Sequence, residues 1–378
     1  MQIEPLSMTH VTESRASEHT PAIFDATIPV VDMNDFFNPE TRGKFVAELA
    51  QALREVGFFA VVNTGVDVAA LDNAYDAARA FFALDIAEKQ KIQCPHFNGQ
   101  RGYVPGESAK DEKRGDFKEF LHIGRPVSSE ESARMGIYPN VWPDNFELEE
   151  PMKALFQALE RHMVPIQEAM AEALGEASGF FCDMTKEGDV LLRAIHYPAN
   201  PPSDSIWAAQ HTDIDLFTIL PRATARGLQV LNDAGEWIDV VVPDNAFIIN
   251  GGDMLENITN GEFRSSVHRV VDCGGNTERY SMVLFVHPRA DDDLTPLPQC
   301  IARTGGVQKY AQATRWDLLE ERLVDLGLAS PEMIQHLGAS GLMERLLDVD
   351  RASVKAMKVL RAHGVASDRV LQRLAEIE

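Results

Sequence analysis

Three residues of the chain combine side-chain types and positions that suit a metal ion. His211 and Asp213 stand two apart, directly before the apolar run 214–220, and on an extended strand such residues point to the same face. His268 lies in another run of strand type, 266–272. Two imidazoles and one carboxylate can hold iron(II) and leave coordination positions open. We therefore predict a metal site at His211, Asp213 and His268, on the condition that the intervening strands fold back.

Asp215 is the alternative carboxylate ligand, because it follows Asp213 at position i+2 and could be mistaken for the ligand. The His-x-Asp spacing favours Asp213. A lone histidine in an apolar strand is more often structural than metal-binding, so the prediction depends on the three candidates occurring together with an anion receptor.

Arg279 and Ser281 are the candidates for that receptor. They stand at positions i and i+2 of a predicted strand and therefore share a face. A guanidinium group with a hydroxyl beside it suits a carboxylate, which it binds through two parallel hydrogen bonds. Tyr197 lies on the first strand of the same block and can donate a hydrogen bond into the same cavity, whereas Arg193 and His196 are interpreted as scaffold or pocket wall.

Further polar residues are candidates for contact with a substrate. His122 and His287 occur in runs of strand type. The charged run 110–118 is predicted to be a solvated loop, in which Arg114 or Lys118 are candidates to face a substrate.

The first half of the chain mixes strands with helices. The segment 97–119 carries several glycines and many charges and is predicted to be a long loop beside a site. The apolar patterns predict strands at 28–32 and 58–63, and helices at 44–54, 68–82, 84–92 and 146–177.

From residue 189 the pattern changes to short strands separated by turns. No long helix interrupts them, which favours a double-sheet jelly roll over a doubly wound parallel sheet. A helix at 307–327 and several short helices between glycines 338, 341 and 364 are predicted to follow. The strands are expected at 189–197, 206–211, 214–220, 227–231, 236–242, 245–250, 266–272 and 279–287.

These residues carry a family resemblance. In its ordered set of motifs the chain resembles an iron(II)- and 2-oxoglutarate-dependent oxygenase of the isopenicillin-N-synthase-like superfamily. The likeness runs over roughly residues 28–327. The matching pieces are His211-Thr212-Asp213, His268, Arg279-Tyr280-Ser281, His196-Tyr197-Pro198, Asn250-Gly251-Gly252-Asp253-Met254-Leu255, Thr259-Asn260-Gly261, Ile28-Pro29-Val30-Val31-Asp32 and Gly57-Phe58-Phe59.

The resemblance implies a cofactor, a cosubstrate and a reaction. Iron(II) would be held by His211, Asp213 and His268, and the far carboxylate of 2-oxoglutarate would pair with Arg279 and Ser281, with Tyr197 also in contact. Oxygen would be consumed, succinate and carbon dioxide released, and a small organic molecule hydroxylated, desaturated or cyclised. The resemblance assigns no catalytic residue beyond the metal centre. Related halogenases lack the carboxylate ligand, so Asp213 argues against halogenation.

The same resemblance leaves two rivals open. One is an oxidase of the same fold that does not use 2-oxoglutarate, in which Arg279 and Ser281 would hold the carboxylate of the substrate. The other is a non-catalytic binding protein that has kept the fold, against which the complete ligand set argues.

The expected fold class is mixed α and β, with a double-stranded β-helix (a cupin-like jelly roll) flanked by helices. Four segments are predicted: a flexible N-terminal segment at 1–27, a helix-and-strand domain at 28–180, a jelly-roll catalytic core with a trailing helix at 181–330, and a C-terminal helical extension at 331–378.

Composition excludes several classes of protein. The net charge of −23 argues against nucleic acid and anionic membranes as partners, since both require a basic surface. The four cysteines form no CxxC pair and are predicted to be reduced. No run of eighteen apolar residues and no N-terminal apolar signal core occur, so we expect a cytoplasmic protein. The sequence does not indicate an oligomeric state.

Overall fold

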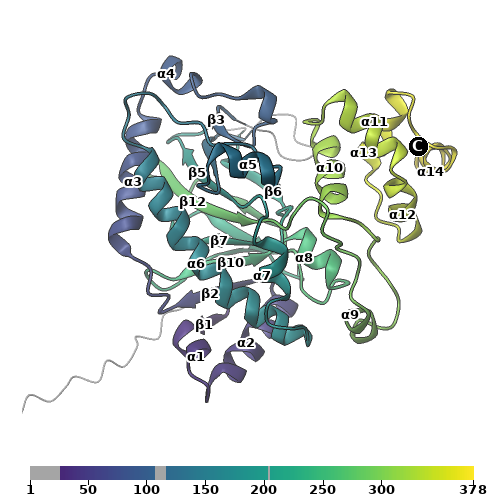
Figure 1. The fold of residues 1–378 in the computed structure, drawn as a ribbon, viewed down its shortest axis with the longest axis horizontal. Helices are drawn as coiled ribbons and strands as arrows, with labels where there is room; N and C mark the ends of the chain where they lie inside the picture. Colours follow the sequence, from purple (N-terminus) through teal and green to yellow (C-terminus); the bar gives the residue numbers. More distant parts are fainter. Residues whose placement is uncertain (1–25, 107–115, 203–204) are drawn as a thin grey trace, which may run out of the picture.

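The computed structural model describes residues 26–106, 116–202 and 205–378. Most of the N-terminal segment 1–27, together with Arg114 and most of the charged run 110–118, therefore lies outside the described residues. Two β-sheets form the centre of the molecule, and helices surround them (Figure 1).

The larger sheet has eight strands. Four central strands from the second half of the chain are flanked by strands from the first half, so both halves share one sheet. The order across the sheet is β1 (Val30–Asp32), β2 (Phe58–Val62), β10 (Phe247–Gly251), β7 (Phe217–Leu220), β12 (Arg279–Val286), β5 (Leu191–Tyr197), β4 (Glu119–Gly124) and β3 (Gly102–Val104).

The smaller sheet has four strands and packs on the larger one. A hydrophobic cluster between the two sheets includes Tyr197 and Ile248 of the large sheet and Leu228 and Val270 of the small one. Its strand order is β6 (Ala208–His211), β11 (His268–Val270), β8 (Leu228–Leu231) and β9 (Trp237–Asp239). The expected double-stranded β-helix core is thus confirmed, with all eight strands predicted after residue 189 present.

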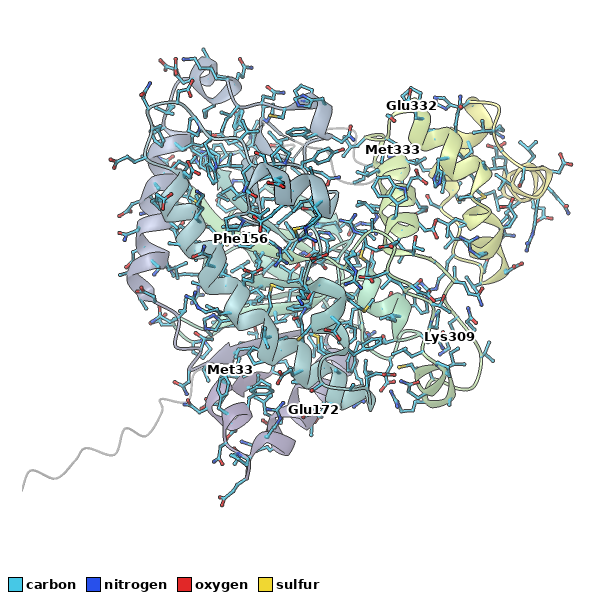
Figure 2. All side chains as sticks on the ribbon, viewed as in Figure 1. Met33, Phe156, Glu172, Lys309, Glu332 and Met333 are labelled. Atoms are coloured by element: carbon cyan, nitrogen blue, oxygen red, sulfur yellow. The ribbon has the colours of Figure 1, made fainter. Side chains whose placement is uncertain are left out.

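The opposite face of the large sheet packs against helices α2 (Arg42–Glu55), α3 (Val68–Phe82) and α6 (Glu149–Leu174), of which α6 runs in front of the strands in Figure 1. Strand alternation explains the two faces: Leu192 packs toward the helices, whereas its neighbour Arg193 points between the sheets. Figure 2 labels two residues of α6, the buried Phe156 and Glu172, which accepts hydrogen bonds from Arg42 of α2.

The C-terminal helices form a group of their own beside the sheets, coloured yellow-green to yellow in Figure 1. Met333, labelled in Figure 2, packs against the main core. The group consists of α10 (Arg315–Leu326), α11 (Pro331–Ala339), α12 (Leu342–Asp348), α13 (Val354–Ala362) and α14 (Asp368–Ile377). Short helices elsewhere are α1 (Met33–Phe37), α4 (Ile86–Gln90), η1 (Pro95–Phe97), α5 (Ser129–Met135), α7 (Phe180–Thr185), α8 (Asp253–Ile258) and α9 (Pro298–Arg303). None of the described helices is long and apolar enough to cross a membrane.

The structure corrects three predictions of local structure. The helix expected at 307–327 begins only at Arg315, because Thr314 and Asp317 form a capping box there and Asn260 bonds the backbone of Lys309. The predicted loop 97–119 contains strand β3, which pairs with β4. Gly338 does not separate two helices but lies inside α11.

Gly338 is needed for packing instead. A Cβ atom at this position would lie 2.7 Å from the carbonyl oxygen of Val365, so only glycine allows α11 to approach that segment so closely.

Candidate metal centre and its two cavities

The three predicted metal ligands lie together between the sheets. His211 and His268 are directly opposed in the antiparallel pairing of β6 and β11, and their ring centroids are 4.3 Å apart. Asp213 Oδ1 lies 3.7 Å from His211 Nε2 and 3.8 Å from His268 Nε2. One metal ion can therefore contact all three atoms.

Asp213 does not continue the strand that carries His211, as the spacing alone predicts. Strand β6 ends at His211, and Asp213 lies in the turn before β7. The backbone of Asp213 is held there by the amide of Asp253, which donates to its carbonyl oxygen over 2.8 Å. Cross-strand pairing thus places the two histidines, and a turn brings the carboxylate to them.

Each histidine presents Nε2 to the site because its other nitrogen is engaged. His211 Nδ1 lies 2.7 Å from the carbonyl oxygen of Ala209, and His268 Nδ1 lies 3.1 Å from that of Ser266. Donation of Nδ1–H to a carbonyl leaves the Nε2 lone pair for a metal. Burial lowers the pKa of His211 to about 3, and His268 beside it adds to this effect, so the imidazole is neutral as a ligand must be.

The carboxylate of Asp213 is fixed through its second oxygen. Oδ2 accepts hydrogen bonds from Thr218 Oγ1 over 2.7 Å and from Asn250 Nδ2 over 2.9 Å. Burial alone would raise the pKa of Asp213, but His268, His211 and these two hydrogen bonds together lower it to about 2. The donor set is therefore two imidazoles and one ionised carboxylate, which fits iron(II).

Asp215 does not join this group. It is fully buried, and a Cβ at Gly252 would lie 2.1 Å from its Oδ1. Burial, with the negative charge of Asp213, raises its pKa well above the usual value. Thr218 Oγ1 lies 2.9 Å from Asp215 Oδ2, so Asp215 supports the residue that orients Asp213.

Arg279, Ser281 and Tyr197 lie together at the predicted anion receptor. Arg279 Nη1 is 3.2 Å from Ser281 Oγ, and its Nε donates to the carbonyl oxygen of Ala225. Arg279 and Tyr197 are paired across β12 and β5, and the guanidinium carbon lies 4.9 Å from the tyrosine ring centroid. All three line one interior cavity of about 60 Å³ together with His211, Asp213 and His268.

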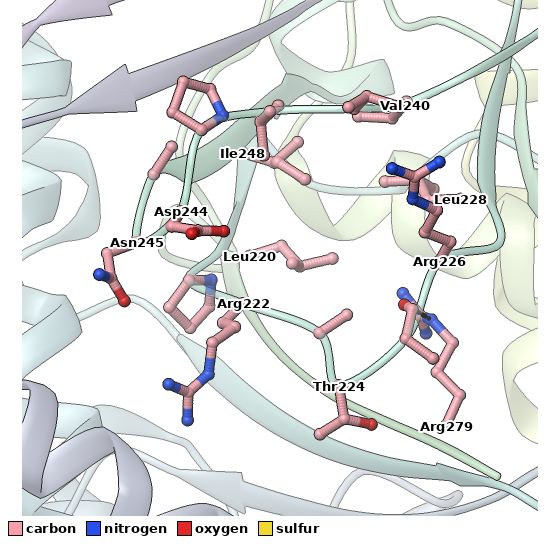
Figure 3. Close-up of a pocket in the computed structure, with 17 residues that line it drawn as sticks. Leu220, Arg222, Thr224, Arg226, Leu228, Val240, Asp244, Asn245, Ile248 and Arg279 are labelled. Atoms are coloured by element: carbon pink, nitrogen blue, oxygen red, sulfur yellow. Dashed lines mark hydrogen bonds between the residues drawn. The ribbon is translucent and has the colours of Figure 1, made fainter. Parts of the chain in front are cut away.

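Arg279 also lines a hollow of about 560 Å³ on its other side, where loops 220–226 and 240–246 meet (Figure 3). Arg222 and Arg226 belong to the walls of this hollow. Arg279 is therefore a shared wall between this hollow and the interior cavity.

A second cavity of about 610 Å³ reaches two of the predicted metal ligands, His211 and Asp213, and α10 forms part of its wall. Of the residues that the sequence offered as substrate contacts or pocket wall, His122, His287, Lys118 and Arg193 line it. His196 lines neither this cavity nor the interior one; it contacts Glu119 and stacks on Tyr280.

Sequence reasoning did not identify the residues that α10 contributes. Arg315 and Arg322 of this helix line the cavity, together with Leu319 and Leu323. The signal was present in the sequence, because residues four and seven apart share one helical face. Until the position of α10 beside the predicted metal ligands is known, these residues show only the pattern of an amphipathic helix.

Comparisons with known proteins identify the family of the chain. A family model described as "non-haem dioxygenase in morphine synthesis N-terminal" matches residues 28–145, and one described as "2OG-Fe(II) oxygenase superfamily" matches residues 188–288. A 2-oxoglutarate-dependent dioxygenase of Penicillium crustosum is 31% identical over 283 residues, covering 71% of this chain and 86% of the relative.

Two solved structures are similar over most of the chain. A protein assigned to the 2OG-Fe(II) oxygenase family in Caulobacter crescentus is 32% identical, with a TM-score of 0.71 over 79% of this chain and 98% of that one. JOX2, solved with 2OG, Fe and JA, is 25% identical, with a TM-score of 0.65 over 78% of this chain and 84% of its own.

Proposed function

The chain belongs to the 2OG-Fe(II) oxygenase superfamily and is an iron(II)- and 2-oxoglutarate-dependent dioxygenase, and from this premise we propose that His211, Asp213 and His268 bind its iron. The observation that carries the assignment is the convergence of two Nε2 atoms and one Oδ1 atom, each with its neighbouring polar atom already engaged. Iron(II) held there would supply the redox chemistry that couples oxidative decarboxylation of 2-oxoglutarate, giving succinate and carbon dioxide, to oxidation of a substrate by oxygen.

We further propose that Arg279 and Ser281 bind the far carboxylate of 2-oxoglutarate, with Tyr197 packed against the guanidinium group. Support comes from the burial of Arg279 and from the cavity that joins it to the metal ligands. The described residues offer Arg279 no carboxylate partner within ion-pair distance, which leaves its charge available to the cosubstrate. The relatives named as 2-oxoglutarate-dependent favour this reading over the oxidase and the non-catalytic protein.

The substrate is proposed to be a small organic molecule in the 610 Å³ cavity, a volume typical of sites for such ligands. Hydroxylation is the reaction we propose, with desaturation and ring closure as outcomes that product analysis distinguishes. The acidic net charge supports the exclusion of nucleic acids and anionic membranes as partners. The four unpaired cysteines support a reducing compartment, and we propose the cytoplasm.

The test uses protein loaded with iron(II) and 2-oxoglutarate without oxygen. We expect a visible metal-to-ligand charge-transfer band, and release of succinate when oxygen is admitted, even in slow uncoupled turnover. His211→Ala and His268→Ala should lose both signals. His363→Ala replaces an exposed histidine at the end of α13 and should keep them. Retention of the band by His211→Ala would contradict the proposed ligand set.

A further inference from the structure

Arg315, the first residue of α10, carries a buried charge without a partner. Its side chain lines the 610 Å³ cavity, yet only 5% of the residue is exposed. No hydrogen bond or ion pair joins its guanidinium group to another of the described residues, and its Nε atom is buried with no acceptor. A buried charge in this state is unfavourable unless a ligand completes it.

Asp189 is the acid that acts electrostatically on Arg315, but it already forms a hydrogen bond with another arginine. Its Oδ1 accepts a hydrogen bond of 2.6 Å from Nη2 of Arg101. Arg101 also donates to the carbonyl oxygens of Gln100 and Tyr138, so this second arginine is satisfied. Burial lowers the pKa of Arg315 and Asp189 acts in the opposite direction, but a guanidinium group remains charged in proteins. Asp189 is thus bonded to Arg101, and no acid among the described residues is bonded to Arg315.

Basic side chains outnumber acids on the wall of this cavity. Among the described residues, five basic side chains line it, against two carboxylates. One of the two acids, Asp213, is assigned to the metal, and the other, Asp116, pairs with Lys118 over 2.8 Å. Arg101 pairs with Asp189 and Arg322 pairs with Asp253, whereas Arg315 has no such ion pair within the described part of the chain. The basic residues are Arg101, Lys118, Arg193, Arg315 and Arg322.

Part of the remaining wall is apolar. Phe285 of β12 and Leu191 of β5 contribute from the large sheet, and Leu319 and Leu323 contribute from α10. A ligand that complements both the unpaired Arg315 and the apolar side chains has one anionic group and an apolar body.

Arg315 and the 2-oxoglutarate receptor lie in different cavities. The cavity of Arg279 and the cavity of Arg315 share the metal ligands His211 and Asp213, whereas neither arginine lines the other's cavity. The metal centre therefore stands between two anion receptors.

We propose that the substrate of this enzyme is an organic acid with an apolar body, whose carboxylate binds Arg315. This inference rests on the proposed function, since it assigns the substrate class of the same site. The planar fork of a guanidinium group offers two parallel N–H donors to a carboxylate. Anchoring one end at Arg315 holds the apolar body along the cavity, so that a carbon at the other end faces the metal ligands.

The test compares carboxylic acids with their uncharged counterparts. A panel of medium-chain alkyl and aryl-alkyl carboxylic acids, each paired with its primary amide, is titrated calorimetrically into anaerobic protein containing iron(II) and 2-oxoglutarate. We expect at least one acid to bind about tenfold more tightly than its amide, the contribution of a hydrogen bond to a charged group. Arg315→Gln and Arg315→Met should abolish this preference, with the charge-transfer band unchanged. Arg134→Gln removes an exposed arginine that pairs with Glu187 and should keep it.

Three results would overturn the proposal: no acid in the panel binds, acids and amides bind equally, or Arg315→Gln retains the preference. Thermal unfolding of the ligand-free protein gives an independent measurement. Arg315→Met should leave the Tm unchanged or raise it, because it removes an unpaired charge, whereas a structural role predicts a lower Tm. Failure of the proposed function would appear differently, as absence of the band and of succinate release from the wild-type protein.

Discussion

Arg322 of α10 donates a hydrogen bond from Nη1 to the carbonyl oxygen of Thr212, the residue between two proposed metal ligands, over 3.1 Å. Its other terminal nitrogen contacts Asp253, and Thr212 Oγ1 donates to the same carboxylate over 3.1 Å. The backbone amide of Asp253 in turn holds Asp213. A helix from the second half of the chain is thus tied to the turn that carries Asp213, a proposed metal ligand.

Replacing Arg322 should therefore weaken metal binding. We expect Arg322→Met to lower the affinity for iron(II) about tenfold, as loss of a group that orients metal ligands commonly does. Anaerobic calorimetric titration with iron(II) measures this. The control is Arg345→Met, because Arg345 bonds Gln312 and also Asp317 in the first turn of α10, but not Thr212. An unchanged affinity in Arg322→Met would mean that the ligand turn is held without α10.

The hydroxyl group of Thr218 is expected to orient Asp213. Thr218→Val keeps the shape of the buried side chain but removes the 2.7 Å hydrogen bond to Asp213 Oδ2, and we expect about tenfold weaker iron(II) binding. Thr218→Ser keeps the hydroxyl group and should bind iron nearly as the wild type does. Equal affinities for the two variants would show that Asn250 alone fixes the carboxylate.

Arg279 should control the affinity for 2-oxoglutarate without affecting the fold. Loss of two charged hydrogen bonds in Arg279→Gln is expected to raise the Kd of the cosubstrate about a hundredfold, and Ser281→Ala should raise it by a smaller factor. The charge-transfer band provides the titration. Arg226→Gln changes an exposed arginine on the outer hollow in Figure 3 and serves as control. A normal Kd in Arg279→Gln would place the cosubstrate elsewhere.

Glu119 should make stability depend on pH. Burial favours its neutral form, but hydrogen bonds from His196, Lys89 and Tyr103 outweigh this and lower its pKa from 4.5 to about 2. The unfolded chain therefore takes up the proton at higher pH, so the ionised carboxylate stabilises the fold above about 4.5. That contribution, on the order of 3 kcal/mol, is lost as the pH falls toward 2.

Urea unfolding of Glu119→Gln tests this dependence. The variant should be less stable than the wild type at neutral pH, and the difference should shrink as the solution is acidified below about pH 4.5. Glu88→Gln removes an exposed ion pair with Lys91 and should have an effect of at most about 1 kcal/mol. A difference that does not change with pH would mean that Glu119 acts by packing.

Much of the fold could be predicted because strands and helices differ in their apolar period. Between residues 189 and 287 every expected strand is present. The predicted beginning of α10, at residue 307, was wrong because the apolar spacing continues upstream of Arg315. The capping box and the hydrogen bonds of Asn260 decide where the helix starts. Side chains distant in sequence thus set that boundary.

The order and spacing of four residues were enough to predict the family and the chemical types at the proposed metal centre. These residues are His211, Asp213, His268 and Arg279. How these residues meet depends on long-range packing: β6 pairs with β11 to oppose the histidines, and Asp213 reaches them from a turn. The same packing also decided that α10 forms part of the cavity wall, with Arg322 bonding a residue 110 positions away. Such contacts depend on how distant segments pack, and local periodicity carries no information about that.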